Sequence, residues 1–177
     1  MIEPDVLRPM VEADLSTVLA LNHAHVELLS PMDEARLRRL IGWACRSDVI
    51  ECDGLVAGFV LVFAPGTAYD SPNYRWFTAR YGERFHYLDR VVVDDRFRRR
   101  GLATAAYEVI EAGAADRERL VLEVNVDPPN QASLAFHEAR GYQEVGRLGE
   151  EGHVVALMAK ALGRSDHRSH TNAGEES

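Results

Sequence analysis

Residues 86–113 constrain the fold most, because an apolar run, four arginines and a glycine follow one another there. The run from His86 to Val93 ends in three valines, which predicts a buried strand. Apolar residues recur at helical spacing after the glycine, which predicts an amphipathic helix carrying Leu102, Ala105, Ala106, Val109, Ile110 and Gly113. We therefore expect a strand, a short basic loop and a helix in close succession.

Such a loop has the properties of an anion site. The first amides of a helix have no partner within the helix and carry partial positive charge. Gly101 would let a ligand approach the backbone closely, and the arginines before it add charge and planar donors. The alternative, from these residues alone, is a solvated basic loop. The segment has neither the Gly-Lys-Ser/Thr of a nucleotide P-loop nor a G-x-G-x-x-G fingerprint.

The overall charge favours a small anion over a nucleic acid. The chain has 28 Asp and Glu against 20 Lys and Arg, a net charge of -8, whereas sequence-independent nucleic-acid binding needs a positive surface. Cys45 and Cys52 have no paired spacing, so we expect reduced thiols. Without a signal peptide or an apolar run of about 18 residues, the chain is expected to be cytoplasmic and not bound to a membrane.

The remaining patterns predict one domain over residues 1–162 and a disordered polar tail over 163–177. His167 and His170 lie in that tail, and we expect no metal site there. The predicted order is strand, two helices, three strands, helix, strand, helix and two strands. The first half of the chain is predicted to form an edge strand 2–8, a helix from 14, a second helix with Ser30 as N-cap and Pro31 in its first turn, and a hairpin 49–52 and 55–64. After the strand and helix described above, we expect a strand 120–126, a helix 130–140 and a closing hairpin 142–148 and 153–159.

Residues 65–85 are predicted to form a long loop with at most a helical turn around Trp76. The segment contains several aromatic residues, including Tyr69 and Tyr74. Two interpretations are equally compatible with it. It can be a lid or a wall for a substrate, or its aromatic side chains can simply pack beneath a long loop.

Two motifs resemble one known family. The stretch "RRRGLA", Arg98 to Ala103, matches the Arg/Gln-x-x-Gly-x-Gly/Ala motif of the GCN5-related N-acetyltransferase (GNAT) superfamily. The stretch "NQASLAFHEARGY", Asn130 to Tyr142, is similar to that family's Asn-x-x-Ala/Ser-x-x-x-Tyr-x-x-x-Gly-Phe pattern. The stretches "LEVNVDPPN" and "AYDSPNYRW" are similar to a small uncharacterised bacterial branch. The resemblance implies an α/β (α+β) fold with a mixed, mostly antiparallel seven-stranded sheet flanked by about four helices.

The resemblance also implies acetyl-CoA as co-substrate. The pyrophosphate would bind the loop and helix start, at Arg98, Arg99, Arg100, Gly101, Leu102, Ala103 and Thr104. The pantetheine arm would lie along Val91, Val92 and Val93 by strand addition. Asn130, Ser133 and Phe136 would line the other side of the arm.

Members of this family transfer acetyl directly to an amine, which requires a base and donors for the developing oxyanion. Asp89 and Glu123 are the candidate bases, and the Val93 amide is the candidate oxyanion donor. Strand alternation would place Asp89 on one face with Tyr87, Val91 and Val93. Asp89 could instead only pair with an arginine, and Glu123 could be a solvated strand residue.

His137 stands where the family usually has the tyrosine that protonates the departing thiolate. A histidine can perform this role because its pKa lies near neutrality. The alternative is a histidine packed in the helix. This departure from the family pattern leaves the identity of the acid open.

The expected partners are acetyl-CoA and an unidentified amine acceptor, which could be a small molecule or a peptide N-terminus, and a homodimer is left open. The rival interpretation is a non-catalytic acyl-CoA-binding sensor with the same fold. A nucleic-acid module that uses the arginines is disfavoured by the acidic net charge.

Overall fold

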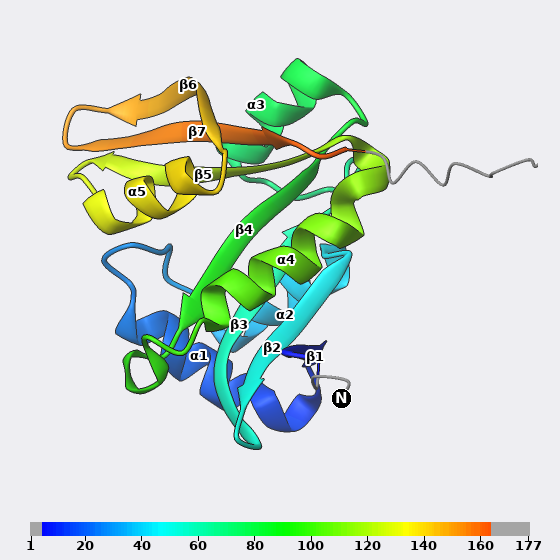
Figure 1. The fold of residues 1–177 in the computed structure, drawn as a ribbon, viewed down its shortest axis with the longest axis vertical. Helices are drawn as coiled ribbons and strands as arrows, with labels where there is room; N and C mark the ends of the chain where they lie inside the picture. Colours follow the sequence, from blue (N-terminus) through cyan, green and yellow to red (C-terminus); the bar gives the residue numbers. More distant parts are fainter. Residues whose placement is uncertain (1–4, 164–177) are drawn as a thin grey trace, which may run out of the picture.

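The computed structural model describes residues 5–163, which form one seven-stranded sheet with five α-helices (Figure 1). The strands are β1 (Leu7–Pro9), β2 (Arg46–Cys52), β3 (Leu55–Phe63), β4 (His86–Val93), β5 (Arg119–Asp127), β6 (Gln143–Glu150) and β7 (His153–Ala161). The helices are α1 (Leu15–Ala24), α2 (Glu34–Trp43), α3 (Pro72–Tyr81), α4 (Leu102–Ala114) and α5 (Gln131–Ala139). The prediction of a mixed seven-stranded sheet is confirmed, with one helix more than expected.

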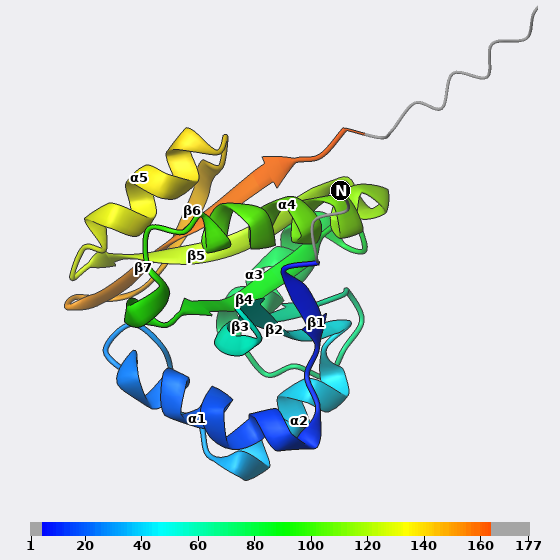
Figure 2. The same ribbon diagram turned by 60° about the horizontal axis from the view of Figure 1, so that its bottom comes forward.

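The strands lie in the order β1-β2-β3-β4-β5-β7-β6. Every neighbouring pair is antiparallel except β4 and β5. Helices α1 and α2 cover one face of the sheet, and α4 and α5 cover the other (Figure 2). The core accordingly has two parts, one that packs Leu37, Phe59 and Tyr87 on the α1 side and one that packs Val60, Ile110 and Leu122 on the α4 side.

Helix α3 corrects the prediction of a long loop over residues 65–85. The Ser71 side chain accepts a hydrogen bond from the Tyr74 amide, and Pro72 occupies the first turn, so the helix has both an N-cap and a favourable start. Tyr74 and Phe77 are buried, and Tyr69 stacks on Phe63 with 4.2 Å between ring centroids. These aromatic side chains therefore belong to the core, as the packing interpretation predicted.

The predicted start of the second helix was also wrong. Helix α2 begins at Glu34, with Asp33 accepting a hydrogen bond from the Arg36 amide. The Ser30 carbonyl instead accepts hydrogen bonds from Asn22 and Arg90, which fixes Ser30 in an extended loop before the helix. Strand β1 is shorter than predicted, residues 1–4 lie outside the described range, and so does the predicted tail from residue 164 onward.

A β-bulge in β4 changes which side chains share a face. Leu88 pairs with Val62 and Arg90 with Leu61, so Asp89 is an extra residue in the ladder. Tyr87 and Val92 consequently pack on the α1 side, whereas Leu88, Val91 and Val93 pack on the α4 side. The predicted common face for Tyr87, Val91 and Val93 is therefore wrong, because alternation was counted across the bulge.

Within residues 5–163, no helix combines the length and the apolar character needed to cross a bilayer. In the same range, no group of three or more His, Cys, Asp or Glu side chains is arranged to hold a metal ion.

The close approach of β3 to β4 depends on Gly58, and this gives a first prediction. A Cβ atom at this position would lie 2.1 Å from the Val92 carbonyl oxygen, at the end of the ladder where Gly58 pairs with Val93. We expect Gly58→Ala to lower the free energy of unfolding by about 1–3 kcal/mol through overpacking. Gly42→Ala is the matched control, because no atom lies within 4 Å of its added carbon and alanine should stabilise helix α2 by up to ~1 kcal/mol. Urea denaturation measures the free energy of unfolding of both variants. Equal values would contradict the conclusion that the approach of β3 to β4 requires a glycine at position 58.

Candidate active site

Strands β4 and β5 separate soon after they meet. They pair only at His86–Leu120 and Tyr87–Val121, although they contain eight and nine residues. Figure 1 shows β4 turning away from β5 beyond this point. The edge of β4 that faces β5 therefore has no strand partner from Leu88 to Val93, and its backbone groups are available to a ligand.

Two cavities open at this separation. The first, which we call the α5-side cavity, has a volume of about 260 Å³ and is walled by β4, β5, α4 and α5. The second, which we call the hairpin-side cavity, has a volume of about 480 Å³ and lies between the loop after α1, the start of α3 and the β6–β7 hairpin. Both cavities are lined by Asp89, Arg90, Glu123 and Asn125, so the polar ends of these side chains lie where the two cavities meet.

The predicted arm-binding residues line the α5-side cavity. Val91, Val92 and Val93 form one wall, and Asn130, Ser133 and Phe136 form part of the opposite wall. The Asn130 side chain also accepts a hydrogen bond of 3.2 Å from the Ser133 amide, which makes it the N-cap of α5. One motif thus fixes the start of the helix and supplies polar groups to the cavity.

The basic loop lies at the end of this cavity. Gly101 has φ 71° and precedes α4, whose first hydrogen bond runs from the Ala105 amide to the Gly101 carbonyl. The amides of Leu102, Ala103 and Thr104 therefore have no partner within the helix. Ala103 reaches the cavity wall, whereas the other predicted pyrophosphate residues lie in the loop and first turn beyond it.

Most of the loop arginines are already paired. Arg96 pairs with Asp94, Arg98 with Asp95, and Arg100 with Asp53, all on the surface. In the described part of the chain, Arg99 forms no ion pair, and it has φ 64°, a left-handed conformation rare outside glycine. Arg99 and Gly101 are thus both left-handed, and only the glycine adopts this conformation without a steric cost.

Asp89 lies in a network of buried polar groups. Its Oδ1 accepts a hydrogen bond of 2.5 Å from the Tyr69 hydroxyl, and its Oδ2 accepts one of 2.9 Å from Arg90 Nε. Arg90 Nη1 donates to Asn22 Oδ1 at 2.7 Å and to the Ser30 carbonyl at 3.0 Å. Asp89 therefore does pair with an arginine, and its side chain, 7% exposed, still lines both cavities.

Glu123 is not the solvated strand residue of the alternative interpretation. Its Oε2 accepts a hydrogen bond of 2.6 Å from the Tyr87 hydroxyl, which itself is fully buried. Burial, together with the nearby negative charge of Asp89, raises the pKa of Glu123 to about 8. A carboxyl group with a pKa near neutrality beside a cavity has the property expected of a general base.

Both ring nitrogens of His137 are engaged inside the protein. Nδ1 lies 2.7 Å from the Ser133 carbonyl, which can only accept, so Nδ1 carries the proton. Nε2 lies 2.6 Å from the Tyr107 hydroxyl and must therefore accept from it. Burial lowers the pKa of His137, which favours this neutral form. Both His137 and Tyr107 line the α5-side cavity.

The sequence did not indicate Tyr87, Arg90 or Tyr107 as site residues, and it indicated Tyr69 only as part of a segment that could form a lid or a substrate wall. Tyr69 and Tyr87 are separated from their carboxylate partners by 20 and 36 positions, respectively. Tyr107 contacts a residue 30 positions away in another helix. The one local signal was the Asp89-Arg90 pair within an otherwise apolar strand, because a charge there must find partners.

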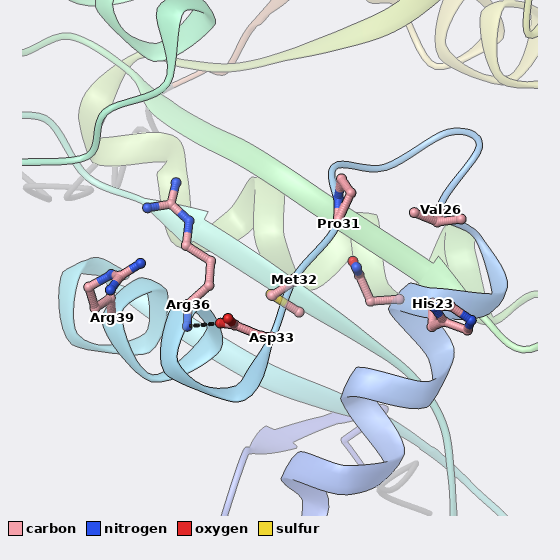
Figure 3. A pocket seen from close by; sticks show the side chains of 8 residues that line it. His23, Val26, Pro31, Met32, Asp33, Arg36 and Arg39 are labelled. Carbon is pink, nitrogen blue, oxygen red and sulfur yellow. Dashed lines mark hydrogen bonds between the residues drawn. The ribbon is translucent and has the colours of Figure 1, made fainter.

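A third hollow of about 400 Å³ lies on the outer side of the loop after α1 (Figure 3). Figure 3 shows Arg36 and Arg39 on α2 and His23 on α1, with Val26 and Pro31 on the loop between the helices. Val26 and Pro31 also line the hairpin-side cavity. Arg36 is bound to Asp70, with 2.6 Å between Nη2 and Oδ1, whereas Arg39 forms no ion pair within residues 5–163.

The sequence profile of the acetyltransferase (GNAT) family matches residues 15–142. This match covers most of the chain and includes both strands and both helices around the α5-side cavity. The chain belongs to the GNAT acetyltransferase family. No curated protein has a sequence that matches this GNAT chain.

Solved structures share its fold. An Ard1 from Thermoplasma volcanium is 18% identical with a TM-score of 0.69, over 88% of this chain and 96% of that one. A ribosomal-protein-alanine N-acetyltransferase from Brucella melitensis is 24% identical with a TM-score of 0.64, over 88% and 99%. The putative acetyltransferase yncA from Salmonella typhimurium, solved with its cofactor acetyl-CoA, is 17% identical with a TM-score of 0.63, over 99% of each chain.

The raised pKa of Glu123 predicts how stability depends on pH. The folded state favours the protonated carboxyl, and this contribution is lost as the pH rises from the ordinary value of 4.5 through about 8. We expect Glu123→Gln to gain stability relative to the wild type between pH 5 and pH 9, by roughly 2 kcal/mol or more. Urea denaturation at both pH values measures this. The exposed Glu138→Gln variant is the control, and an equal pH dependence in both variants would refute the prediction.

Proposed function

We propose that the protein transfers an acetyl group directly from acetyl-CoA to a primary amine. The observation that carries this proposal is the meeting of two cavities, from opposite faces of the sheet, at Asp89 and Glu123. One cavity can hold the donor and the other the acceptor, so the reacting groups would meet between β4 and β5. The family's use of acetyl-CoA supports this assignment.

In this proposal the pyrophosphate binds the amides at the start of α4, where Gly101 permits close approach of the backbone and Arg99 supplies charge. The pantetheine arm then follows the unpaired edge of β4 along Val91 and Val93. A strand edge suits this arm because each of its amides finds a complementary backbone group.

Glu123 is the proposed base. The ionised fraction of Glu123 grows as the pH approaches its pKa of about 8, and this form accepts a proton from an incoming ammonium. The resulting amine attacks the thioester carbonyl. The Val93 amide is the proposed donor to the oxyanion. The Asp89 carboxylate, which accepts hydrogen bonds from Tyr69 and Arg90, would attract the ammonium.

The leaving thiolate needs a hydrogen-bond donor, and we propose that the pair formed by Tyr107 and His137 supplies this donor. Neutral His137 directs its only N–H at the Ser133 carbonyl, away from any thiolate. The Tyr107 hydroxyl carries the proton between the two side chains. As the sulfur departs, the Tyr107 O–H would turn from His137 Nε2 to the thiolate and donate its hydrogen bond there. Burial raises the pKa of Tyr107, so the hydroxyl would do this without losing its proton. His137 would hold the hydroxyl in place before the sulfur departs.

A test of the donor site uses Gly101. Gly101→Val places a β-branched side chain in a left-handed conformation and in the open space through which the pyrophosphate would approach the backbone. We therefore expect acetyl-CoA affinity to fall at least tenfold, or about 1.4 kcal/mol, by calorimetry. Gly54→Val is the matched control, since Gly54 has φ 74° in the β2–β3 turn. The wild type should also release CoA when amines are added. Binding of acetyl-CoA without amine-dependent release would instead establish a sensor.

A second test concerns the Tyr107–His137 pair. Tyr107→Phe removes the hydroxyl and should lower kcat on the order of 10–100-fold while acetyl-CoA affinity stays within about twofold. The double variant Tyr107→Phe/His137→Tyr returns a hydroxyl to the same space from α5 and should recover most of the rate. Steady-state kinetics measure both. Full activity of Tyr107→Phe, or no recovery in the double variant, would remove the pair from the mechanism.

A further inference from the structure

The hairpin-side cavity is predominantly acidic. The charged or titratable side chains of residues 5–163 that line it are Glu27, Asp89, Arg90, Glu123 and His153. The one arginine is adjacent to Asp89 and forms an ion pair with it at 2.9 Å. A carboxylate carried by a ligand would therefore enter a site whose only arginine already forms an ion pair.

Arg90 is nevertheless able to bind an uncharged oxygen. Its side chain is 5% exposed, with Nε bound to Asp89 and Nη1 bound to Asn22 and the Ser30 carbonyl. Nη2 forms no hydrogen bond to any residue in the described range, although the side chain lines both cavities. Within residues 5–163 no buried side-chain nitrogen lacks a partner, so Nη2 is in contact with solvent. A guanidinium nitrogen that is open to solvent and has no protein partner is a strong donor for a carbonyl oxygen at this wall.

The loop after α1 makes the entrance apolar. Val26 is 39% exposed and Leu28 is 51% exposed, and both line the hairpin-side cavity together with Leu29. Leu148 and Val155 of the β6–β7 hairpin add apolar surface to the cavity wall. An apolar substituent next to the reacting amine would lose water on entering this space, which favours its binding.

These three observations narrow the chemical class of the acceptor, and the inference drawn from them rests on the proposed function. We propose that the acceptor is the α-amino group of a peptide N-terminus with an apolar first residue. The ammonium lies at Glu123 and Asp89, the first peptide carbonyl accepts a hydrogen bond from Arg90 Nη2, and the first side chain contacts Val26 and Leu28. A free amino acid is disfavoured because its carboxylate would face Asp89, Glu123 and Glu27.

Three matched acceptors test this proposal in the wild-type protein. Leucinamide has the ammonium, side chain and uncharged carbonyl of a peptide N-terminus, leucine replaces the amide by a carboxylate, and isoamylamine lacks the carbonyl. With CoA release as the measurement, we expect kcat/KM for leucinamide to exceed both others at least tenfold. Leucine used as well as leucinamide would overturn the inference and leave the proposed function intact. No release with any amine, in protein that binds acetyl-CoA, would overturn both.

Variants of Arg90 test the role of the guanidinium. Arg90→Lys keeps the charge and loses the fork of donors, so we expect the preference for leucinamide over isoamylamine to fall to within about twofold. This ratio does not depend on how much of the variant is folded. Arg39→Lys is the control, because Arg39 lines only the third hollow and its variant should keep the wild-type ratio. An unchanged preference in Arg90→Lys would show that Arg90 does not bind the carbonyl.

Discussion

The short pairing of β4 with β5 is the constraint on which the rest of the site depends. Two strands that are hydrogen-bonded over only two residue pairs must separate, and the bulge at Asp89 increases this divergence. The separation exposes a strand edge on one side and opens the sheet to both of its faces. A continuous ladder would fill this space and would bury Asp89 and Glu123 without access to a ligand.

Charge burial at this opening is tolerated because every charge has partners. Arg90 joins Asp89 to Asn22 on α1 and to Ser30 in the loop before α2. The same bonds hold the loop that forms the entrance of the hairpin-side cavity. Removing one member would leave another buried charge without a partner, which is far more costly than the net contribution of the intact pair. The charge of Asp89 and the position of the loop after α1 are thus coupled through Arg90.

The Tyr107–His137 pair shows how a departure from a family motif can be compensated in three dimensions. The motif resemblance places a tyrosine at the position of His137, and the chain supplies a tyrosine hydroxyl 2.6 Å from the imidazole from the neighbouring helix. Histidine at position 137 of α5 is shorter than tyrosine, which leaves room for the Tyr107 side chain of α4. Each residue alone suggests packing, whereas together they place a hydroxyl at the wall of the α5-side cavity.

The sequence by itself determined the features that depend on neighbouring residues. The limits of β4, the start of α4 after Gly101 and the Asn130 cap of α5 all follow from local patterns, and the structure agrees with them. Helix α3 had a local signal in Ser71 and Pro72, but the Pro, Gly, Ser and Asn residues of segment 65–85 predicted a loop. Only the tertiary structure decided the face of Val91 and Val93, the partners of Asp89 and Glu123, and the orientation of His137. These depend on a bulge, on burial and on hydrogen bonds between distant segments, because contacts that set an electrostatic environment form only when the chain has folded.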